Sequence, residues 1–374
     1  MCPGLKFCMP LCLLIFISIS QISGAIRYKE ACFDSVEVKA DLYYRTAPDY
    51  EMNPDSLFMD FYEPKGDTAL TRPVVVLLYG GSFITGSRKD ALITTYSSYL
   101  ARCGYAVFAI DYRIGINLLA ASLQAELPAA TYRAVQDSRA AVRFIRKNAE
   151  VFKIDTTRIF GMGYSAGAIT LLHHAYLDLA EASQNQLLVA AVSLLGDLDQ
   201  GDNLQYSSKI DCIINCCGAI ADTSWIKAGD TPILSFHGTN DQTVPYGTGY
   251  AFNNPSTTLL FGSSIIDQKA KTVGIPSVLI SFEGAGHSLE GEPRITIPIT
   301  TVNFLYGLMN GSPIRKKIPW KSDRIVSHTL ANQYFDLSGR LIKKQVRTSS
   351  ALIVHRNQNT TTPVLIMNSN VAKQ

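Results

Sequence analysis

An α/β fold with a mostly parallel central sheet is predicted for this chain of 374 residues. Two observations carry that prediction. Short apolar runs bounded by turn residues recur along the sequence and alternate with helical patterns. In addition, 47% of the residues are hydrophobic and only 17% are charged, which is typical of a globular protein with a sizeable core.

The expected strands follow in chain order. Runs at 35–44 and 56–64 are expected to form two antiparallel strands. Seven further runs are continuously apolar, as expected for strands buried on both faces. They lie at 73–80, 105–112, 158–164, 187–195, 211–218, 232–238 and 276–284.

The longest helical pattern covers residues 127–152. It predicts one apolar stripe, made of Ala134, Val135, Ser138, Ala141, Val142 and Ile145. Arg139, Arg143 and Lys147 are expected to lie largely away from that stripe. Alternating strands and helices are expected to form a mostly parallel sheet with helices on both faces. Ligands of such sheets bind at the carboxyl ends of the strands.

The first 25 residues predict a secretory signal peptide. A lone Lys6 precedes an apolar run at 7–19, and small residues follow around Ala25. The run is short for a bilayer span, although an uncleaved membrane anchor is the alternative. The prediction implies a secreted or cell-surface protein.

Charge and cysteine usage exclude several classes of partner. A net charge of +3 with no basic stripe argues against nucleic acid. Five cysteines follow the apolar run, namely Cys32, Cys103, Cys212, Cys216 and Cys217. That number is odd, so at least one thiol is expected to stay unpaired or to pair outside the chain. No Cys-x-x-Cys pair supports a zinc or redox site, and buried free thiols are therefore expected. The hydrolytic chemistry predicted below requires neither a metal nor an organic cofactor.

The pentapeptide at 163–167, Gly-Tyr-Ser-Ala-Gly, follows a predicted strand and opens a helical pattern. This G-x-S-x-G setting is typical of a tight strand-to-helix turn that exposes a serine at the sheet edge. Glycines are needed where the backbone passes too close for a Cβ atom. Ser165 is therefore the candidate nucleophile; a glycine-rich turn with a capping serine is the alternative.

A serine hydroxyl needs an adjacent base. His287 follows the last predicted strand in a glycine-flanked loop and comes after Ser165, the chain order that this arrangement requires. His237, at a strand end, is the alternative. His173 and His174 lie two helical turns beyond Ser165 and are expected to point into their own helix.

The orienting carboxylate is expected between the nucleophile and the base. Asp241 lies in a short polar loop after the strand at 232–238, where it can hold the imidazole tautomer. Asp267 in a predicted helix, and Glu283 and Glu290 close to His287, compete with it. A solvated loop aspartate is the remaining interpretation.

Acyl transfer also needs hydrogen-bond donors for an oxyanion. The backbone N–H of Ala166 is one candidate, and those of Gly81 and Ser82, in the loop after the strand at 73–80, are the others. Phe83, Tyr164 and Trp225 are candidate walls of a substrate pocket, although plain packing is the commoner role of such aromatic residues.

Together these segments resemble the α/β-hydrolase superfamily, in particular secreted bacterial carboxylesterases related to hormone-sensitive lipase and to feruloyl and acetyl-xylan esterases. The resemblance covers roughly 56–308 and rests on "YGGSFITGSR", "AIDYR", the segment ending in "GYSAG", "HGTNDQTVP" and "GAGHS". It implies an α/β-hydrolase fold, a Ser165–His287–Asp241 triad and no cofactor. Tyr79 departs from the family, which usually has histidine there.

The C-terminal part has a different pattern. A basic linker at 311–323 follows the catalytic region at 26–310, and 324–374 contains short strand-like runs such as "YFDLSGRLI" and "ALIVHR". This segment resembles the C-terminal sorting domain of type IX secretion substrates, which implies a small β unit recognised by a secretion machinery. An unrelated β extension is the alternative.

The sequence thus predicts a secreted serine carboxylesterase that acts on small or polysaccharide-linked esters, with acetyl or feruloyl esters suggested by the resemblance. A peptidase of the same fold would share the triad but is expected to carry a large cap or extra domain, for which 196–224 is too short. A catalytically silent binding protein on the same scaffold is the other alternative. Acyl specificity and oligomeric state are not predicted.

Overall fold

A computed structural model of the protein describes residues 25–117 and 123–311, together with the backbone of four short strands further along. The chain divides into two compact units, Met1–Lys316 and Lys317–Gln374. In the second unit, Tyr334–Phe335 (β12) pairs with Leu341–Ile342 (β13), and Ile353–His355 (β14) with Val364–Ile366 (β15), both antiparallel. The predicted signal peptide up to residue 24, the predicted linker from 312 to 323 and the rest of the C-terminal segment lie outside the described residues.

The first unit is built on an eight-stranded sheet with the order β1-β2-β4-β3-β5-β6-β8-β11. The first two strands pair antiparallel with each other, and β2 pairs antiparallel with β4, whereas all pairs from β4 to β11 are parallel. The strands are β1 (Val36–Pro48), β2 (Pro54–Pro64), β3 (Arg72–Leu78), β4 (Ala106–Ile110), β5 (Ile154–Tyr164), β6 (Cys212–Cys216), β8 (Ile233–Gly238) and β11 (Ser277–Phe282).

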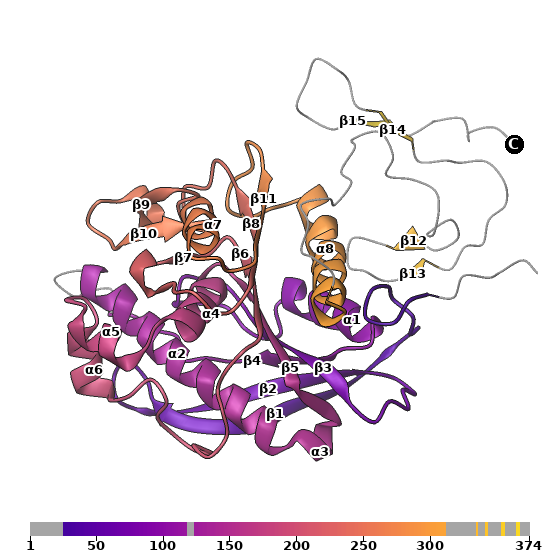
Figure 1. Ribbon diagram of the computed structural model, residues 1–374, viewed down its shortest axis with the longest axis horizontal. Coiled ribbons are helices and arrows are strands. Elements are labelled where there is room, and N and C mark those ends of the chain that lie inside the picture. Colours follow the sequence, from indigo (N-terminus) through magenta and orange to yellow (C-terminus); the bar gives the residue numbers. More distant parts are fainter. Residues whose placement is uncertain are drawn as a thin grey trace, which may run out of the picture. The chain divides into compact units, whose positions relative to one another are not determined.

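Helices cover both faces of this sheet, as predicted. Figure 1 shows α1 (Ala91–Arg102) and α8 (Glu292–Met309) side by side on one face, and α2 (Leu123–Lys147) and α4 (Ala166–Tyr176) on the other. The shorter helices are α3 (Ala149–Phe152), α5 (Leu179–Gln184), α6 (Val189–Leu195) and α7 (Ser263–Thr272). None of the helices in residues 25–117 and 123–311 is long and apolar enough to cross a bilayer.

A small second sheet lies beside the carboxyl ends of the main strands. It has the order β7-β10-β9, formed by Ala219–Ile220, Leu259–Gly262 and Thr248–Tyr250. Two single-turn helices, Thr223–Trp225 (η1) and Ala251–Asn253 (η2), flank these strands. In the chain, β7 follows β6, and β9 and β10 lie between β8 and α7.

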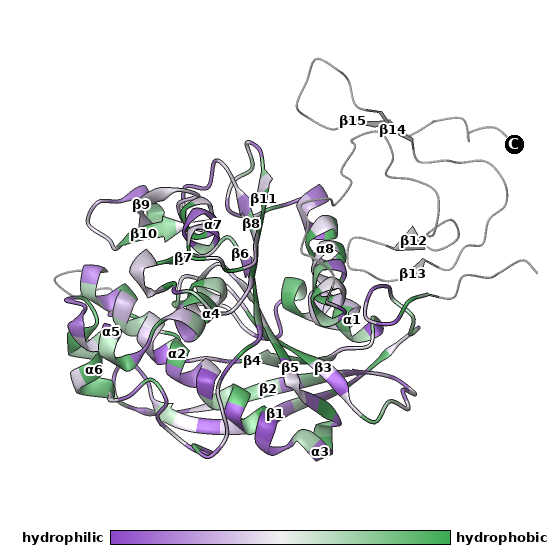
Figure 2. Cartoon of the chain, viewed as in Figure 1, coloured by the Kyte–Doolittle hydropathy of each residue, from purple (hydrophilic) through white to green (hydrophobic). Residues whose placement is uncertain are grey.

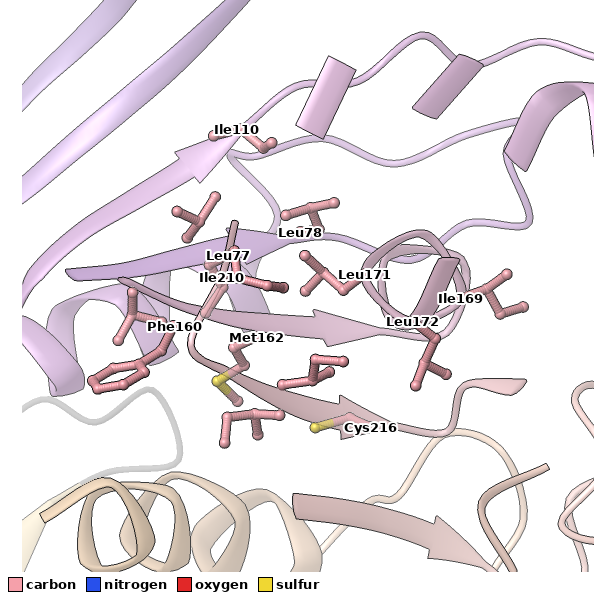
Figure 3. Packing of buried hydrophobic residues seen from close by; sticks show 14 of the residues in the cluster. Leu77, Leu78, Ile110, Phe160, Met162, Ile169, Leu171, Leu172, Ile210 and Cys216 are labelled. Atoms are coloured by element: carbon pink, nitrogen blue, oxygen red, sulfur yellow. The ribbon is translucent and has the colours of Figure 1, made fainter. Parts of the chain in front are cut away.

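The central strands are buried on both faces. β3, β4 and β6 contain no exposed residue, and Figure 2 shows the middle of the sheet in the hydrophobic colour. Leu171 of α4 lies toward Leu78 and Ile210, whereas Ile169 lies on the opposite side of the same helix (Figure 3). One side of α4 therefore packs on the sheet, and the opposite side remains available to line a functional site.

One predicted strand is wrong. Residues 187–195 form the end of a loop and α6, not a strand. Leu188 and Ala191 are buried while Val189 and Leu194 are exposed, so burial repeats with a helical period. A continuous apolar run predicts a strand that is buried on both faces, but about half of the side chains in this run are exposed to solvent.

The predicted apolar stripe of α2 is confirmed, because all six of its residues are buried. Arg143, which lies away from that stripe as predicted from the helix period, is also buried. Its guanidinium pairs with Asp199 at 2.7 Å and donates to the carbonyl oxygens of Gln200 and Asp202. The loop after α6 thus covers this arginine, and a buried cation is tolerated because its donors are satisfied.

Two adjacent histidines of α4 are buried in the neutral form. Burial lowers the pKa of His173 to about 4 and that of His174 to about 3. His174 contacts the Ser138 hydroxyl and donates through Nε2 to the carbonyl of Ser208, at 2.7 and 2.8 Å. In the unfolded chain both rings would titrate near their ordinary pKa of about 6.5.

This difference predicts acid-sensitive stability. Between pH 7 and pH 5 the unfolded chain takes up protons that the folded chain does not, so the free energy of unfolding falls as the pH falls. His174→Gln, which keeps polar contacts at this position, should reduce the loss by about 2 kcal/mol over this interval. Urea unfolding of both proteins at the two pH values measures the effect, and equal losses would contradict it.

Candidate active site

The turn between β5 and α4 presents Ser165 as the sequence predicts. Ser165 has φ 54° and ψ −119°, a strained backbone conformation for a residue with a side chain. A Cβ atom at Gly163 would lie 2.4 Å from the carbonyl oxygen of Gly167, and one at Gly167 would lie 2.5 Å from those of Leu78 and Tyr79. Both glycines are required because three backbone segments meet there.

The structure brings Ser165, His287 and Asp241 together. His287 Nε2 lies 2.8 Å from Ser165 Oγ, and His287 Nδ1 lies 2.6 Å from Asp241 Oδ2. Since the carboxylate only accepts, Nδ1 carries the proton and Nε2 accepts from the serine hydroxyl. The three come from the ends of β5, β8 and β11, so parallel strands deliver them to one edge of the sheet.

Asp241 is held by many donors. Its Oδ1 accepts from the backbone N–H groups of Thr243 and Val244 at 2.8 and 3.0 Å. Its Oδ2 lies 3.2 Å from His237 Nε2. Burial by itself would raise the pKa of Asp241, but the hydrogen bonds from His237 and His287 outweigh it and hold that pKa well below its usual range. Asp241 is therefore an anion beside His287.

His237, the alternative base, supports the carboxylate instead of the serine. Its ring is fully buried, with Nε2 donating toward Asp241 and the carbonyl of Val244, and with Nδ1 2.7 Å from Ser263 Oγ. Asn215 donates to that same serine oxygen at 3.0 Å. The sequence analysis did not assign this buried network, because only the fold brings β6, β8 and α7 together.

Cys217 lies close to Asp241 and His287. Its sulfur is within 4.8 Å of ligand atoms of Asp241 and His287, a grouping that could in principle hold a metal ion. Burial raises the pKa of the Cys217 thiol well above its usual range, with the Asp241 carboxylate adding to the effect. A metal ligand must be a thiolate, so a neutral thiol beside Asp241 is the better description. The five cysteines of the described residues are free.

The other competing carboxylates lie elsewhere. Asp267 is in α7, where it pairs with Lys271 and accepts from Ser277 at 2.7 Å. Glu290 is 74% exposed at its side chain and lies 3.4 Å from Arg294. Glu283 follows β11 at the surface. None of the three contacts His287.

The candidate oxyanion donors lie beside the serine. Gly81 has φ 122° and a Cβ there would lie 2.2 Å from the carbonyl oxygen of Thr85, so this tight loop requires glycine. Among the described residues, the N–H groups of Gly81 and Ser82 have no backbone or side-chain acceptor. Ala166 is the first residue of α4, so its N–H also lacks an intrahelical partner.

Tyr79, at the start of the loop that follows β3, is part of a reciprocal pair with Tyr112. Its ring stacks on Tyr112 with centroids 4.4 Å apart. Tyr112 donates its hydroxyl to the carbonyl of Tyr79 at 2.8 Å, and Tyr79 donates to the carbonyl of Tyr112 at 3.3 Å. These bonds fix the first residue of the loop to the segment that follows β4.

A cavity of about 680 Å³, partly open to solvent, begins at Ser165. Its walls are mostly apolar and come from α2, α4, the α5–α6 loop and the small sheet. They are formed by Ser82, Phe83, Leu127, Pro128, Thr131, Ser165, Ala166, Ile169, His173, Asn185, Leu187, Leu188, Ala221, Thr243, Val244, Ala251, Phe252, Thr258 and Leu260. A concave, mostly apolar space beside a candidate nucleophile is typical of small-molecule sites.

Of the three aromatic residues predicted to form the pocket, only Phe83 lines this cavity. Tyr164 instead donates its hydroxyl to the carbonyl of His287 at 2.6 Å and so fixes the histidine loop. Trp225 packs edge-on against the ring of His173 at 5.6 Å, behind the cavity wall. The remaining lining residues were missed, although the spacing of Ser165, Ile169 and His173 marks one face of a helix.

The sheet order and the turn at Ser165 define an α/β-hydrolase fold. A family model described as BD-FAE matches residues 59–221. Acetylcholinesterase of Gallus gallus is 35% identical over 129 residues, which are 34% of this chain and 16% of that protein. Carboxylesterase 5A of Homo sapiens is 28% identical over 179 residues, which are 47% of this chain and 30% of that protein.

A solved structure of esterase 2 from Thermogutta terrifontis phosphorylated by paraoxon superposes with a TM-score of 0.52 at 20% identity. The alignment covers 74% of this chain and 95% of that one. The chain thus spans less than a third of the length of the curated relatives named above, but nearly the whole of a compact esterase. At this identity the superposition establishes the fold.

Gly167→Ala tests the close backbone approach. The added Cβ would meet two backbone carbonyl oxygens that cannot move aside, and the expected cost of overpacking, about 3 kcal/mol, exceeds the gain in helix propensity of about 1 kcal/mol. Gly286→Ala is the control, because nothing lies within 4 Å of a Cβ there. Denaturant unfolding should show a large loss for the first variant only; equal stabilities would contradict the analysis.

Proposed function

We propose that this protein is an exported serine carboxylesterase that hydrolyses carboxylic esters through Ser165, His287 and Asp241 and a covalent acyl-enzyme. One observation carries the proposal: an uninterrupted hydrogen-bonded chain from a strained serine through a histidine to a buried carboxylate, with distances of 2.8 and 2.6 Å. Hydrolysis by this route needs no metal and no organic cofactor.

The reaction begins when Ser165 Oγ attacks the ester carbonyl carbon and His287 Nε2 takes the hydroxyl proton. The N–H groups of Gly81, Ser82 and Ala166 stabilise the oxyanion. The bond to the alcohol breaks, and the alcohol leaves with the proton from Nε2. Water then attacks the acyl-enzyme, gives a proton to His287, and releases the acid while Ser165 regains its hydrogen.

The relatives support the ester as substrate. Two of the proteins that this chain is similar to are named acetylcholinesterase and carboxylesterase 5A, and the solved neighbour is an esterase phosphorylated by paraoxon. Esters of polysaccharides with acetyl or feruloyl groups are our proposed natural substrates, by resemblance and by the predicted export. The apolar cavity beside Ser165 favours an ester with a sizeable apolar part over one with an acetyl group alone.

Ser165→Ala is the decisive variant. Removing the nucleophile should lower kcat for a short ester such as 4-nitrophenyl acetate by about 10⁴-fold or more, and abolish labelling by a fluorophosphonate probe. Ser193→Ala, an exposed serine of α6, is the matched control and should behave as the unaltered protein. Labelling that persists in Ser165→Ala would overturn the assignment of the nucleophile.

The same measurements separate the alternatives. A peptidase of this fold would be labelled but would cleave an aminoacyl amide faster than the matching ester. A silent binding protein would neither turn over ester nor react with the probe. The absence of a propeller or large cap among the described residues disfavours the peptidase.

Export is a second proposal, which rests on the sequence of the two ends of the chain. Expressed in a bacterium that has a type IX secretion system, the full chain should lose about its first 25 residues and reach the medium or the cell surface. Deletion of 324–374 should leave it in the periplasm. N-terminal sequencing and fractionation test both steps, and an intact N-terminus in every fraction would contradict the signal peptide.

A further inference from the structure

The base of the triad lies on a loop with little support from side-chain packing. Residues 283–291, called the histidine loop below, join β11 to α8. Leu289 is the one buried residue among them, and the side chain of His287 is 19% exposed. The position of this loop therefore depends largely on hydrogen bonds.

Few hydrogen bonds hold the backbone of the histidine loop. Near its start, the carbonyl oxygen of Ala285 accepts from the N–H of Asn240 at 3.0 Å. Between Ala285 and Gly291, a single hydrogen bond joins the loop backbone to another segment of the described chain. In that bond the hydroxyl of Tyr164 donates to the carbonyl oxygen of His287 at 2.6 Å. One phenol thus anchors the backbone that carries the base.

Tyr164 is held more firmly than the loop that it supports. It is the last residue of β5 and pairs with Cys216 of β6, whose carbonyl oxygen accepts from the N–H of Ser165 at 2.8 Å. The Tyr164 ring also lies against the loop of the candidate oxyanion donors, because a Cβ atom at Gly80 would lie 3.2 Å from its Cδ1. Tyr164 therefore connects the nucleophile turn, the oxyanion loop and the histidine loop.

The phenol is a donor in its bond to the histidine loop. A carbonyl oxygen can only accept, so the proton comes from Tyr164. Burial raises the pKa of Tyr164 above its usual range, and the hydroxyl therefore stays protonated at neutral pH. The Tyr164 and His287 rings also pack beside each other, with centroids 5.9 Å apart. Tyr164 thus contacts both the backbone and the ring of the base.

The imidazole of His287 must meet two partners at once. Its Nε2 lies 2.8 Å from Ser165 Oγ, and its Nδ1 lies 2.6 Å from Asp241 Oδ2. Both distances depend on where the loop backbone places the Cα atom of His287. A misplacement of a catalytic group by about 1 Å can lower a rate by about 100-fold. An anchor on the backbone of His287 itself is therefore at the position where it affects the chemistry most directly.

We propose that Tyr164 is a positioning residue for the base, and that its hydroxyl fixes the backbone of His287 so that the imidazole reaches Ser165 and Asp241 together. The inference rests on the proposed ester hydrolysis at Ser165. Tyr164 does not line the cavity, so its role is separate from substrate binding. Because His287 moves protons in both the formation and the hydrolysis of the acyl-enzyme, Tyr164 supports both half-reactions.

Tyr164→Phe, which removes only the hydroxyl, tests the inference on the full chain. With 4-nitrophenyl acetate, kcat should fall at least about tenfold while KM stays within about threefold, because both half-reactions slow and the cavity is unchanged. Paraoxon, which phosphorylates the solved neighbour, releases one 4-nitrophenolate for each active serine. Its stoichiometric release counts the active sites, so a loss of folded protein is not mistaken for a loss of rate.

Tyr96→Phe is the matched control. Tyr96 of α1 is also a buried tyrosine whose hydroxyl donates to a backbone carbonyl, that of Arg294 at 3.3 Å, but Arg294 lies in α8 and outside the histidine loop. The substitution removes the same chemical group from the same kind of bond. The kcat of this variant should stay within about twofold of that of the unaltered protein.

A double-mutant cycle separates positioning of the base from general support of the fold. In His287→Ala the base is absent, and the residual hydrolysis comes from the oxyanion donors and substrate binding. Adding Tyr164→Phe to this variant should change kcat by less than about twofold, because Tyr164 acts through the base. A tyrosine that only supports the fold would lower kcat by the same factor in both backgrounds.

The results distinguish the inference from the proposed function. The inference is wrong if Tyr164→Phe keeps the kcat of the unaltered protein, if its loss persists in His287→Ala, or if Tyr96→Phe loses as much. The esterase proposal stands in each of these three cases. If the unaltered protein hydrolyses no ester, or if His287→Ala keeps full activity, the proposed function fails and the inference fails with it.

Discussion

The close approach of three backbone segments at the carboxyl edge of the sheet is the constraint on which the rest of the structure depends. The start of α4 passes so near the end of β3 that only glycine fits at position 167. This contact fixes Ser165 in a strained conformation and points the N-terminus of α4 at the site. The loop at 80–83 then lies beside the serine because it continues from the same end of β3.

Around that turn, buried polar groups are linked to Ser165 by a series of hydrogen bonds. Asn215, Ser263 and His237 are fully buried and hold Asp241, which in turn orients His287 toward Ser165. Each bond places the next group, so Ser165, which lines the cavity, is positioned through groups that are fully buried. Buried polar networks of this kind are favourable only when their members are satisfied, which is the case here.

Much of this arrangement could be predicted from the sequence. Eight of the nine predicted strands are present, because continuous apolar runs bounded by turns leave few other choices. The exception, 187–195, shows the limit: a short apolar run does not reveal whether one or both of its faces will be covered. The cavity walls were largely missed, because they come from many separate segments whose side chains are ordinary core residues in sequence.

What the sequence by itself determined is the class of fold and the chemistry-bearing residues at the strand ends, since parallel strands must deliver their carboxyl ends to one edge. Only the tertiary structure decided which of two histidines with similar positions in the sequence contributes to the site. His237 lies at the end of a strand and His287 in the loop after another, and only packing shows that the first is enclosed beside Asp241 while the second reaches Ser165. Likewise, His173 and His174 are adjacent in sequence, but helix rotation gives one of them alone a place on the cavity wall.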